Sequence, residues 1–302
     1  MVARLISVTG GNGEKVGNMS DDADKMAGAA PADTALLGLS RADGSSPNAS
    51  YIVPGLHRGL TILTLFRRDR QRLSLSEIAR LLDLPRSAAF RLVYTLESLG
   101  FLVRSPIDDR YGLGLRVLDL GYTLFNSMDV VDLAEEPLRQ LREKTNGSVH
   151  LARIDGAEIV YLMRFAAPNA LSSNVQIGAR LPAYATTLGR ALLMDAGRAD
   201  LMRIFGDVTA LPAFTRTTAQ SVEALEEQLR DDQARGYVIG HSIYESGLDT
   251  MAAPIRDGHD RIVAAISVVG FGLMKQTDPS PEAVVAAVLD TAETIHRALG
   301  AH

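Results

Sequence analysis

The chain has 302 residues, no cysteine and a formal net charge of −5 at pH 7. The length favours two domains, and the lack of cysteine excludes disulfides and thiol chemistry. No apolar run approaches the ~18 residues of a membrane-spanning helix, and the chain does not begin with the basic and apolar segments of a signal peptide. We therefore expect a cytoplasmic protein.

The first 53 residues are rich in Gly, Ala, Ser and Asp and show little periodicity. This composition predicts a mostly disordered tail. The GGNG run at Gly10–Gly13 is not interpreted as a nucleotide-binding loop, because no strand pattern precedes it and no helix pattern follows it.

Residues 54–68, PGLHRGLTILTLFRR, form the first expected helix. Leu56, Leu60, Leu63 and Phe66 recur on one face of it. We expect this face to pack behind the two helices that follow.

Residues 73–98 predict two short helices joined by a tight turn. Ser74 and Glu77 have the spacing of a capping box, in which each side chain satisfies a backbone N–H of the other residue. Pro85 opens the second helix, where its missing N–H costs little, and Gly100 is placed to end it as a left-handed cap. The buried faces are predicted to hold Leu75, Ile78, Ala79 and Leu82, and then Ala89, Leu92, Val93 and Leu96.

A predicted hairpin follows, with arms at 101–104 and 110–113 around the turn residues 105–109. Two helices, a turn and a hairpin in this order are typical of a winged helix-turn-helix that places its second helix in the major groove. The alternative is a plain helical hairpin with solvated arginines. The predicted DNA-binding residues are Ser76, Arg86, Ser87, Ala88, Arg91 and Tyr94, with Arg104 and Arg110 on the hairpin for phosphates.

The charge distribution favours DNA as the partner. Residues 54–126 hold eleven arginines, no lysine and seven acids, a net charge of +4, so the rest of the chain carries −9. A single basic segment in an acidic protein localises the electrostatic footprint for nucleic acid.

An apolar stripe marks the next segment, residues 115–127. Leu115, Leu118, Tyr122 and Phe125 repeat at helical spacing, and a small winged domain is too small to cover them. We expect a linker helix over 115–128 that packs against its copy in a second chain.

The remainder, residues 129–302, alternates helix and strand patterns and predicts an α+β domain. Asp155-Gly156 signals a hairpin between two strands, and a second hairpin turns at Gly258. Helices are expected at 129–147, 186–196, 221–236 and 281–300, and strands at 148–154, 158–165, 174–182, 237–243, 248–257 and 261–271.

Four segments, in order, resemble the IclR family of bacterial transcription regulators. They are LSLSEIARLLDLPRSAAFRLVYTLESLGFL, GARLPAYATTLGRALL, ARGYVIGHSIYESGLDTMAAPIRD and IVAAISVVG. The resemblance runs from about residue 54 to 299. It implies a winged helix domain (54–114), a linker helix (115–128) and a GAF-like effector-binding domain (129–302). It also implies a homodimer or dimer of dimers on a palindromic operator, and the second segment resembles the branch that controls catabolism of aromatic acids.

The same resemblance implies a pocket for a small carboxylate where Thr186–Gly189 begins a helix. Helix starts offer unpaired N–H groups to an anion, although the threonines could simply cap the helix. Some family members have a carboxylate and a cysteine where this chain has Gly240 and Thr250, and the lost carboxylate suits an aromatic or larger acid. The expected effector residues are Leu181, Tyr184, Thr186, Thr187, Leu188, Thr250, Ser267 and Val269.

A metal site, an enzyme and a DNA-architectural protein are the alternatives to a ligand-responsive regulator. The six histidines are scattered, and a metal site would need His150 and His241 to converge with carboxylates. His150 is expected either to line the pocket or to satisfy a core hydrogen bond. His241, Glu245 and Asp249 lie close enough to consider an enzyme, but no nucleophile, Walker loop or dinucleotide fingerprint accompanies them. A DNA-architectural protein without a ligand would not need so large a second domain. We therefore expect no catalysis, no metal and no cofactor.

Overall fold

The structure is a computed structural model that describes residues 48–167, 175–206, 210–273, 275 and 278–300. The predicted disordered tail lies almost wholly outside this range, and so does Asn174 of the expected strand 174–182. The last residues of the predicted tail include a short 3-10 helix, Ala49–Tyr51.

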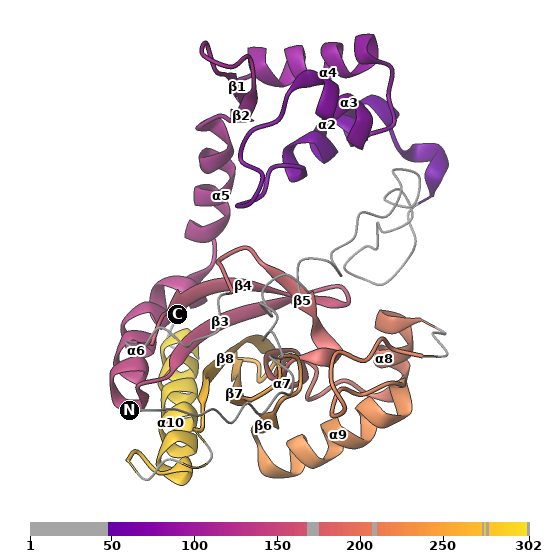
Figure 1. The fold of residues 1–302 in the computed structure, drawn as a ribbon. Helices are drawn as coiled ribbons and strands as arrows, with labels where there is room; N and C mark the ends of the chain where they lie inside the picture. Colours follow the sequence, from indigo (N-terminus) through magenta and orange to yellow (C-terminus); the bar gives the residue numbers. More distant parts are fainter. Residues whose placement is uncertain (1–47, 168–174, 207–209, 274, 276–277, 301–302) are drawn as a thin grey trace, which may run out of the picture. The chain divides into compact units, whose positions relative to one another are not determined.

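The N-terminal domain is a winged helix (Figure 1). Its wing strands pair antiparallel, with Leu102 opposite Leu113 and Arg104 opposite Tyr111. A bridge from Leu73 to Tyr111 attaches the wing to the segment before the second helix. The elements are α2 (Pro54–Thr64), α3 (Leu75–Leu81), α4 (Arg86–Ser98), β1 (Leu102–Arg104) and β2 (Tyr111–Leu113).

Local chemistry accounts for the helix boundaries here. The Glu77 N–H donates to Ser74 Oγ over 3.3 Å and the Ser74 N–H donates to Glu77 Oε2 over 2.7 Å, so the predicted capping box is confirmed. Gly100 has a φ of +79° just after α4, as expected of a left-handed cap. Pro85 stands at the N-cap position, so α4 begins at Arg86, one residue after the predicted start.

The packing predicted for the first helix is confirmed for Leu63 and Phe66, which pack against the core of this domain, and was wrong for Leu56 and Leu60. Helix α2 ends at Thr64, and its fully buried side chain is Ile62. Leu56 and Leu60 are 63% and 56% exposed. The helix is apolar on several sides, so spacing alone could not show which side meets the small core of this domain.

Helix α5 (Arg116–Asn126) follows the wing and has no buried residue. Leu115, Leu118 and Tyr122 of the predicted stripe are exposed, and so are Leu120 and Leu124 on the other side of the helix. Among the described residues, no helix has both the length and the apolar character needed to cross a bilayer.

The C-terminal domain is α+β, with a six-stranded antiparallel sheet in the order β5-β4-β3-β8-β7-β6. Helix α6 (Asp129–Thr145) leads into the sheet through Asn146, whose φ is +54°. The predicted hairpins β3–β4 and β7–β8 are confirmed. The strands are β3 (Ser148–Asp155), β4 (Glu158–Phe165), β5 (Arg180–Pro182), β6 (Val238–His241), β7 (Leu248–Arg256) and β8 (Ile262–Phe271).

Helices cover both faces of this sheet (Figure 1). One face carries an apolar core with α6 and the long α10 (Pro281–Gly300). The opposite face packs against α7 (Thr187–Leu192), α8 (Arg198–Phe205) and α9 (Val222–Arg235). Because strand residues alternate between faces, neighbours in sequence belong to different cores. The site described below lies on the second face.

Three predictions for this domain need correction. The expected strand 174–182 is reduced to three residues, because Ile177 and Gly178 form a turn and Gly178 has a φ of +82°. The helix expected over 186–196 ends at Leu192. Helix α8 was missed, although Leu201 and Phe205 of its buried side stand at i, i+4 spacing.

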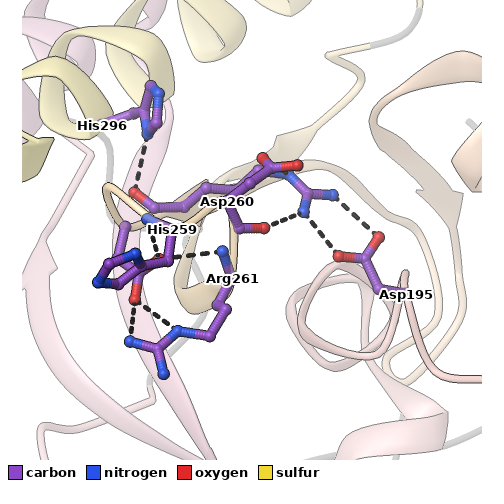
Figure 2. Close-up of polar contacts among 7 residues, drawn as sticks. Asp195, His259, Asp260, Arg261 and His296 are labelled. Atoms are coloured by element: carbon purple, nitrogen blue, oxygen red, sulfur yellow. Dashed lines mark hydrogen bonds and ion pairs between the residues drawn. The ribbon is translucent and has the colours of Figure 1, made fainter.

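Ion pairs fasten the turns around the sheet. Figure 2 shows the β7–β8 turn, where Arg256 makes two hydrogen bonds of 2.6 and 2.9 Å to Asp195 beyond α7. His296 of α10 lies 3.0 Å from the Arg256 carbonyl oxygen. A hydrogen bond from the Arg261 side chain is the main reason that the pKa of Asp257 falls to about 2. These groups are mutually satisfied and serve to hold the hairpin.

Candidate functional site: the exposed face of helix α4 and a partly open cavity

The exposed face of α4 carries the predicted DNA-reading side chains. Arg86, Ser87, Arg91 and Tyr94 are exposed, and Ala88 is half-buried. A cleft separates α4 from the wing. It is lined by Ser74, Leu75, Ser76, Arg86, Ser87, Phe90, Arg91, Arg104, Asp108, Asp109 and Tyr111.

The arginines of α4 differ in their surroundings. Arg86 Nη1 donates a hydrogen bond to Ser76 Oγ and so ties the start of α4 to α3. Within the described residues, the Arg91 guanidinium makes no hydrogen bond or ion pair. Arg91 is therefore free to use its forked donors on a base edge or a phosphate.

The wing arginines are already engaged. Arg104 lies 3.0 Å from Asp109. Arg110 lies 3.2 Å from Glu77 and also donates to the Arg72 carbonyl oxygen over 3.2 Å. The hydrogen bond from the Ser74 backbone is the main reason that the pKa of Glu77 is lowered. Glu77 thus serves both the capping box and the attachment of the wing, a second role that sequence spacing did not indicate.

A partly open cavity of about 70 Å³ lies between α7 and the sheet. Seven of the eight residues expected around an effector meet there, from segments far apart in the sequence. Sequence reasoning missed the six others, of which Ile243, Tyr244 and Glu245 follow β6. The lining residues are Tyr161, Val175, Leu181, Thr186, Thr187, Leu188, Ile243, Tyr244, Glu245, Leu248, Thr250, Ser267 and Val269.

The two neighbouring threonines at the start of α7 do different things. Thr186 Oγ1 accepts a hydrogen bond of 3.0 Å from the Gly189 N–H, so Thr186 is the N-cap. The Thr187 hydroxyl makes no hydrogen bond within the described part of the chain. The six residues of α7 make a short stack of peptide dipoles, so hydroxyl groups are the stronger polar feature of this cavity.

Tyr184 is the expected effector residue that the structure places elsewhere. It belongs to a 3-10 helix, η2 (Ala183–Ala185), and its hydroxyl donates to the Pro212 carbonyl oxygen over 2.8 Å. Its ring packs edge-on to Phe205, with 5.9 Å between centroids. The tight turn of η2 directs Tyr184 into the core beneath the cavity wall.

Gly240 allows the cavity its present shape. A Cβ atom at this position would lie 2.2 Å from Ile243 Cδ1 and 2.6 Å from Thr187 Cγ2. A larger residue here therefore requires both neighbours to move. This packing explains physically why a carboxylate side chain is absent from this position.

The histidines that the structure describes do not assemble a metal site. Among the described residues, no group of His, Asp and Glu side chains could hold a metal ion. His241 Nδ1 lies 2.5 Å from Asp249 Oδ1 across β6 and β7, while Glu245 lines the cavity. His150 is buried, lies behind the lining residues and has no hydrogen-bond partner within the described residues, so neither expectation for it held as stated.

A buried ion pair fastens α7 to α9. Arg190 Nε and Nη2 each donate a hydrogen bond of 2.7 Å to Asp232. Both side chains are almost wholly buried. This two-pronged contact holds α7 beside the cavity.

Comparison with known proteins agrees with this architecture. The family model "Bacterial transcriptional regulator IclR C-terminal" matches residues 122–297, and "IclR helix-turn-helix domain" matches residues 55–106. The chain is 30% identical to the HTH-type transcriptional regulator XynR of Escherichia coli over 72% of this chain and 86% of that protein. It is also 30% identical to the Pca regulon regulatory protein of Pseudomonas putida over 70% of this chain and 72% of that protein.

A solved structure is similar throughout. It is an IclR homologue from Microbacterium hydrocarbonoxydans in complex with 4-hydroxybenzoate, with a TM-score of 0.72 and 27% identity over 82% of this chain and all of that one. The matched relatives are named as transcriptional regulators and repressors, not as enzymes. The chain therefore belongs to the IclR family and is a ligand-responsive, DNA-binding transcriptional regulator.

Proposed function

We propose that this regulator responds to a small aromatic carboxylic acid that binds in the cavity between α7 and the sheet. The observation that carries the proposal is the convergence of seven of the eight anticipated residues on that cavity. Leu181, Leu188 and Val269 supply apolar walls, and hydroxyl groups of Thr187, Thr250 and Ser267 are spaced among them. A few polar groups in an apolar pocket are typical of small-molecule sites.

Two relatives support an aromatic effector. The Pseudomonas putida relative is named for the Pca regulon, and the Microbacterium structure holds 4-hydroxybenzoate. The described lining residues include no lysine, arginine or histidine, so hydroxyl and backbone N–H groups would receive the carboxylate. Such a site binds an anion through hydrogen bonds and not through a paired charge.

The cavity is small for an aromatic acid, so binding requires the protein to change shape. An engineered apolar cavity of roughly 150 Å³ binds benzene, and this cavity measures about 70 Å³. An aromatic acid would therefore have to enlarge it, and Tyr244 and Glu245 on the loop after β6 would be the first residues to move. A ligand that changes the protein in this way binds one conformation better than the other, which is the requirement for a switch.

The proposal assigns DNA reading to α4 and dimerisation to α5. Arg91 would contact a base edge, with Arg86, Ser87 and Ser76 beside it, and the wing would follow the phosphates. Leu118 of α5 is 67% exposed, and a second copy of the chain would cover this helix. Helix α5, within the linker 115–128, joins the winged helix domain (54–114) to the effector-binding domain (129–302). It would therefore transmit ligand binding to the DNA-binding surface. We expect this regulation to take place in the cytoplasm.

Titration of the full-length protein with 4-hydroxybenzoate tests the effector site. We expect binding by calorimetry and an altered affinity for a DNA duplex selected by the protein from a random library. Leu188→Arg should abolish the ligand response and leave DNA binding intact, because a long cation fills the cavity. The matched control, Tyr184→Phe, alters a neighbour outside the cavity and should keep the response; an unchanged response in Leu188→Arg would move the site elsewhere.

The selected duplex also tests the reader. Arg91→Ala should lose roughly 1–3 kcal/mol of discrimination between that duplex and a scrambled one. Arg110→Ala should weaken binding to both duplexes and reduce the salt dependence, because the wing loses a phosphate contact and its attachment to Glu77. Equal affinities of wild type and both variants would refute the groove assignment.

Light scattering tests the assembly. Wild-type protein at micromolar concentration should be at least dimeric without DNA, and Leu118→Asp should reduce dimerisation and DNA affinity together, because two half-sites need two linked readers. A wild-type monomer would contradict the role given to α5.

A further inference from the structure

Two buried polar side chains stand side by side on the cavity-facing side of the sheet. His150 of β3 and Ser267 of β8 are directly opposite each other in the antiparallel register, so both point to the same face. Ser267 lines the cavity. The His150 ring lies edge-on to the ring of Tyr161, another lining residue, with 5.4 Å between centroids. His150 therefore lies directly behind the cavity wall.

Neither side chain has a partner in the protein. His150 is 1% exposed and Ser267 is fully buried, yet both ring nitrogens and the serine Oγ lack a hydrogen bond within the described residues. Buried polar groups in native proteins are nearly always paired, so an exception calls for a specific explanation. Here the exceptions adjoin each other and a cavity.

The protonation state of His150 limits what it can bind. Burial, and next the nearby charge of Arg164, lower the pKa of His150 to about 3. The imidazole is therefore neutral near pH 7, with one nitrogen that donates and one that accepts. Burial also raises the pKa of Tyr161, which stays a neutral phenol. The described residues that line this part of the cavity offer neutral donors and acceptors, and the nearest cation, Arg164, lies opposite His150 on β4 behind the lining residues.

We propose that Ser267 binds a hydroxyl group of the effector and that His150 positions Ser267 for it, so that the sensor selects a hydroxy acid. This inference rests on the proposed function, in which the cavity is the effector site. Residues directly opposite in antiparallel strands have Cβ atoms about 4.5–5.5 Å apart, so rotation of the Ser267 hydroxyl brings it to His150. Ser267 then donates to the imidazole and accepts from the ligand hydroxyl. Because Arg164 is not among the residues that line the cavity, a second carboxylate in the same place would lack direct contact with a cation.

Calorimetry on the full-length protein tests this selectivity with acids that differ in one group. The probes are 4-hydroxybenzoate against benzoate, lactate against propanoate, and the dicarboxylate terephthalate. In at least one pair, the hydroxylated acid should bind about tenfold more tightly, the effect of one hydrogen bond. Terephthalate should bind more weakly than benzoate.

Substitutions of His150 separate a positioning role from a packing role. His150→Leu has nearly the same volume and no polar atom, so the preference for the hydroxylated acid should fall to about one. His150→Gln keeps a neutral donor and acceptor and should retain part of the preference. Without ligand at pH 7.5, His150→Leu should raise the melting temperature, because it removes unpaired buried polar atoms, whereas loss of a structural histidine would lower it.

The outcomes distinguish this inference from the proposed function. Equal affinities within both pairs in the wild type, or a preference that persists in His150→Leu, would overturn the inference and leave the cavity as the effector site. If none of the five acids binds, the proposed effector class is wrong. In that case the melting temperature of His150→Leu still tests the inference. A fall would show that His150 is a structural residue and would overturn the inference, whereas a rise would support the conclusion that His150 is unpaired without ligand.

Discussion

The two faces of the C-terminal sheet carry different kinds of side chain. Towards α6 and α10, strands β3 and β8 present Val149, Leu151, Ile266 and Val268, all fully buried. Towards α7, the residues between them are His150, Ala152, Ala265, Ser267 and Val269. One face is a uniform apolar core, whereas the other mixes small, polar and apolar groups around a cavity. We propose that the first face supplies stability and that the second, through the cavity, supplies ligand selectivity.

The cavity face itself contains two kinds of polar group. Asp232 accepts hydrogen bonds from Arg190 and Arg235, whereas His150 and Ser267 make no hydrogen bond to each other. We expect the paired charges next to the cavity to stabilise the fold, and the unpaired polar groups to bind the ligand. Four predictions test this division.

Removal of one partner of the buried ion pair should have the largest effect. Asp232→Ala leaves the Arg190 guanidinium buried without a counter-charge, which should cost roughly 3–5 kcal/mol of unfolding free energy. The double variant Arg190→Met with Asp232→Leu should recover most of that loss. Urea denaturation measures both. A loss below ~1 kcal/mol in Asp232→Ala would show that water reaches Arg190 and that the pair is not structural.

Adjacent residues of β8 offer a matched comparison of the two faces. Ile266→Ala on the apolar face should destabilise by about 2–5 kcal/mol, because it leaves a cavity in a fully packed core. Ser267→Ala should change stability by less than ~0.5 kcal/mol, since the lost hydroxyl has no partner. Similar losses in the two variants, by urea denaturation without ligand, would erase the distinction between the faces.

The buried imidazole should make stability depend on pH. Because the pKa of folded His150 is about 3 and that of the unfolded residue is about 6.5, the unfolded chain binds a proton that the folded protein does not in this range. Stability should therefore fall as the pH is lowered from about 6.5 to 3, by about 1.4 kcal/mol per unit from this residue. His150→Leu should show a shallower slope than wild type in urea denaturation at several pH values. The exposed His259→Leu serves as the control and should keep the wild-type slope.

The neighbouring threonines of α7 should show the smallest effects. Thr186→Ala removes the N-cap and should cost about 1 kcal/mol of stability. Thr187→Val should leave the melting temperature unchanged and weaken ligand binding by roughly fivefold, the equivalent of one hydrogen bond. A stability loss in Thr187→Val and not in Thr186→Ala would show that Thr187, and not Thr186, is the residue that stabilises the start of α7.

Features that depend on local chemistry could be predicted from the amino-acid sequence. The capping box of Ser74 and Glu77, the turn at Gly100 and the hairpin at Asp155-Gly156 each involve residues a few positions apart, so spacing specified them. The winged helix, the α+β class and the start of α7 follow from such local signals. Family resemblance then placed Thr187, Thr250 and Ser267 near one another, because similar sequences share a fold.

Features that depend on distant partners became visible only in the folded protein. Tyr184 turns towards Pro212, Arg110 binds Glu77, and Ile62 in place of Leu56 enters the core of the N-terminal domain. Each outcome depends on what surrounds the side chain in space, and periodicity cannot report it. The same holds for His150: its position in a strand was readable, but its lack of a partner depends on every element packed around it. Satisfaction of buried polar groups is a property of the assembled core, so no local pattern could have shown it.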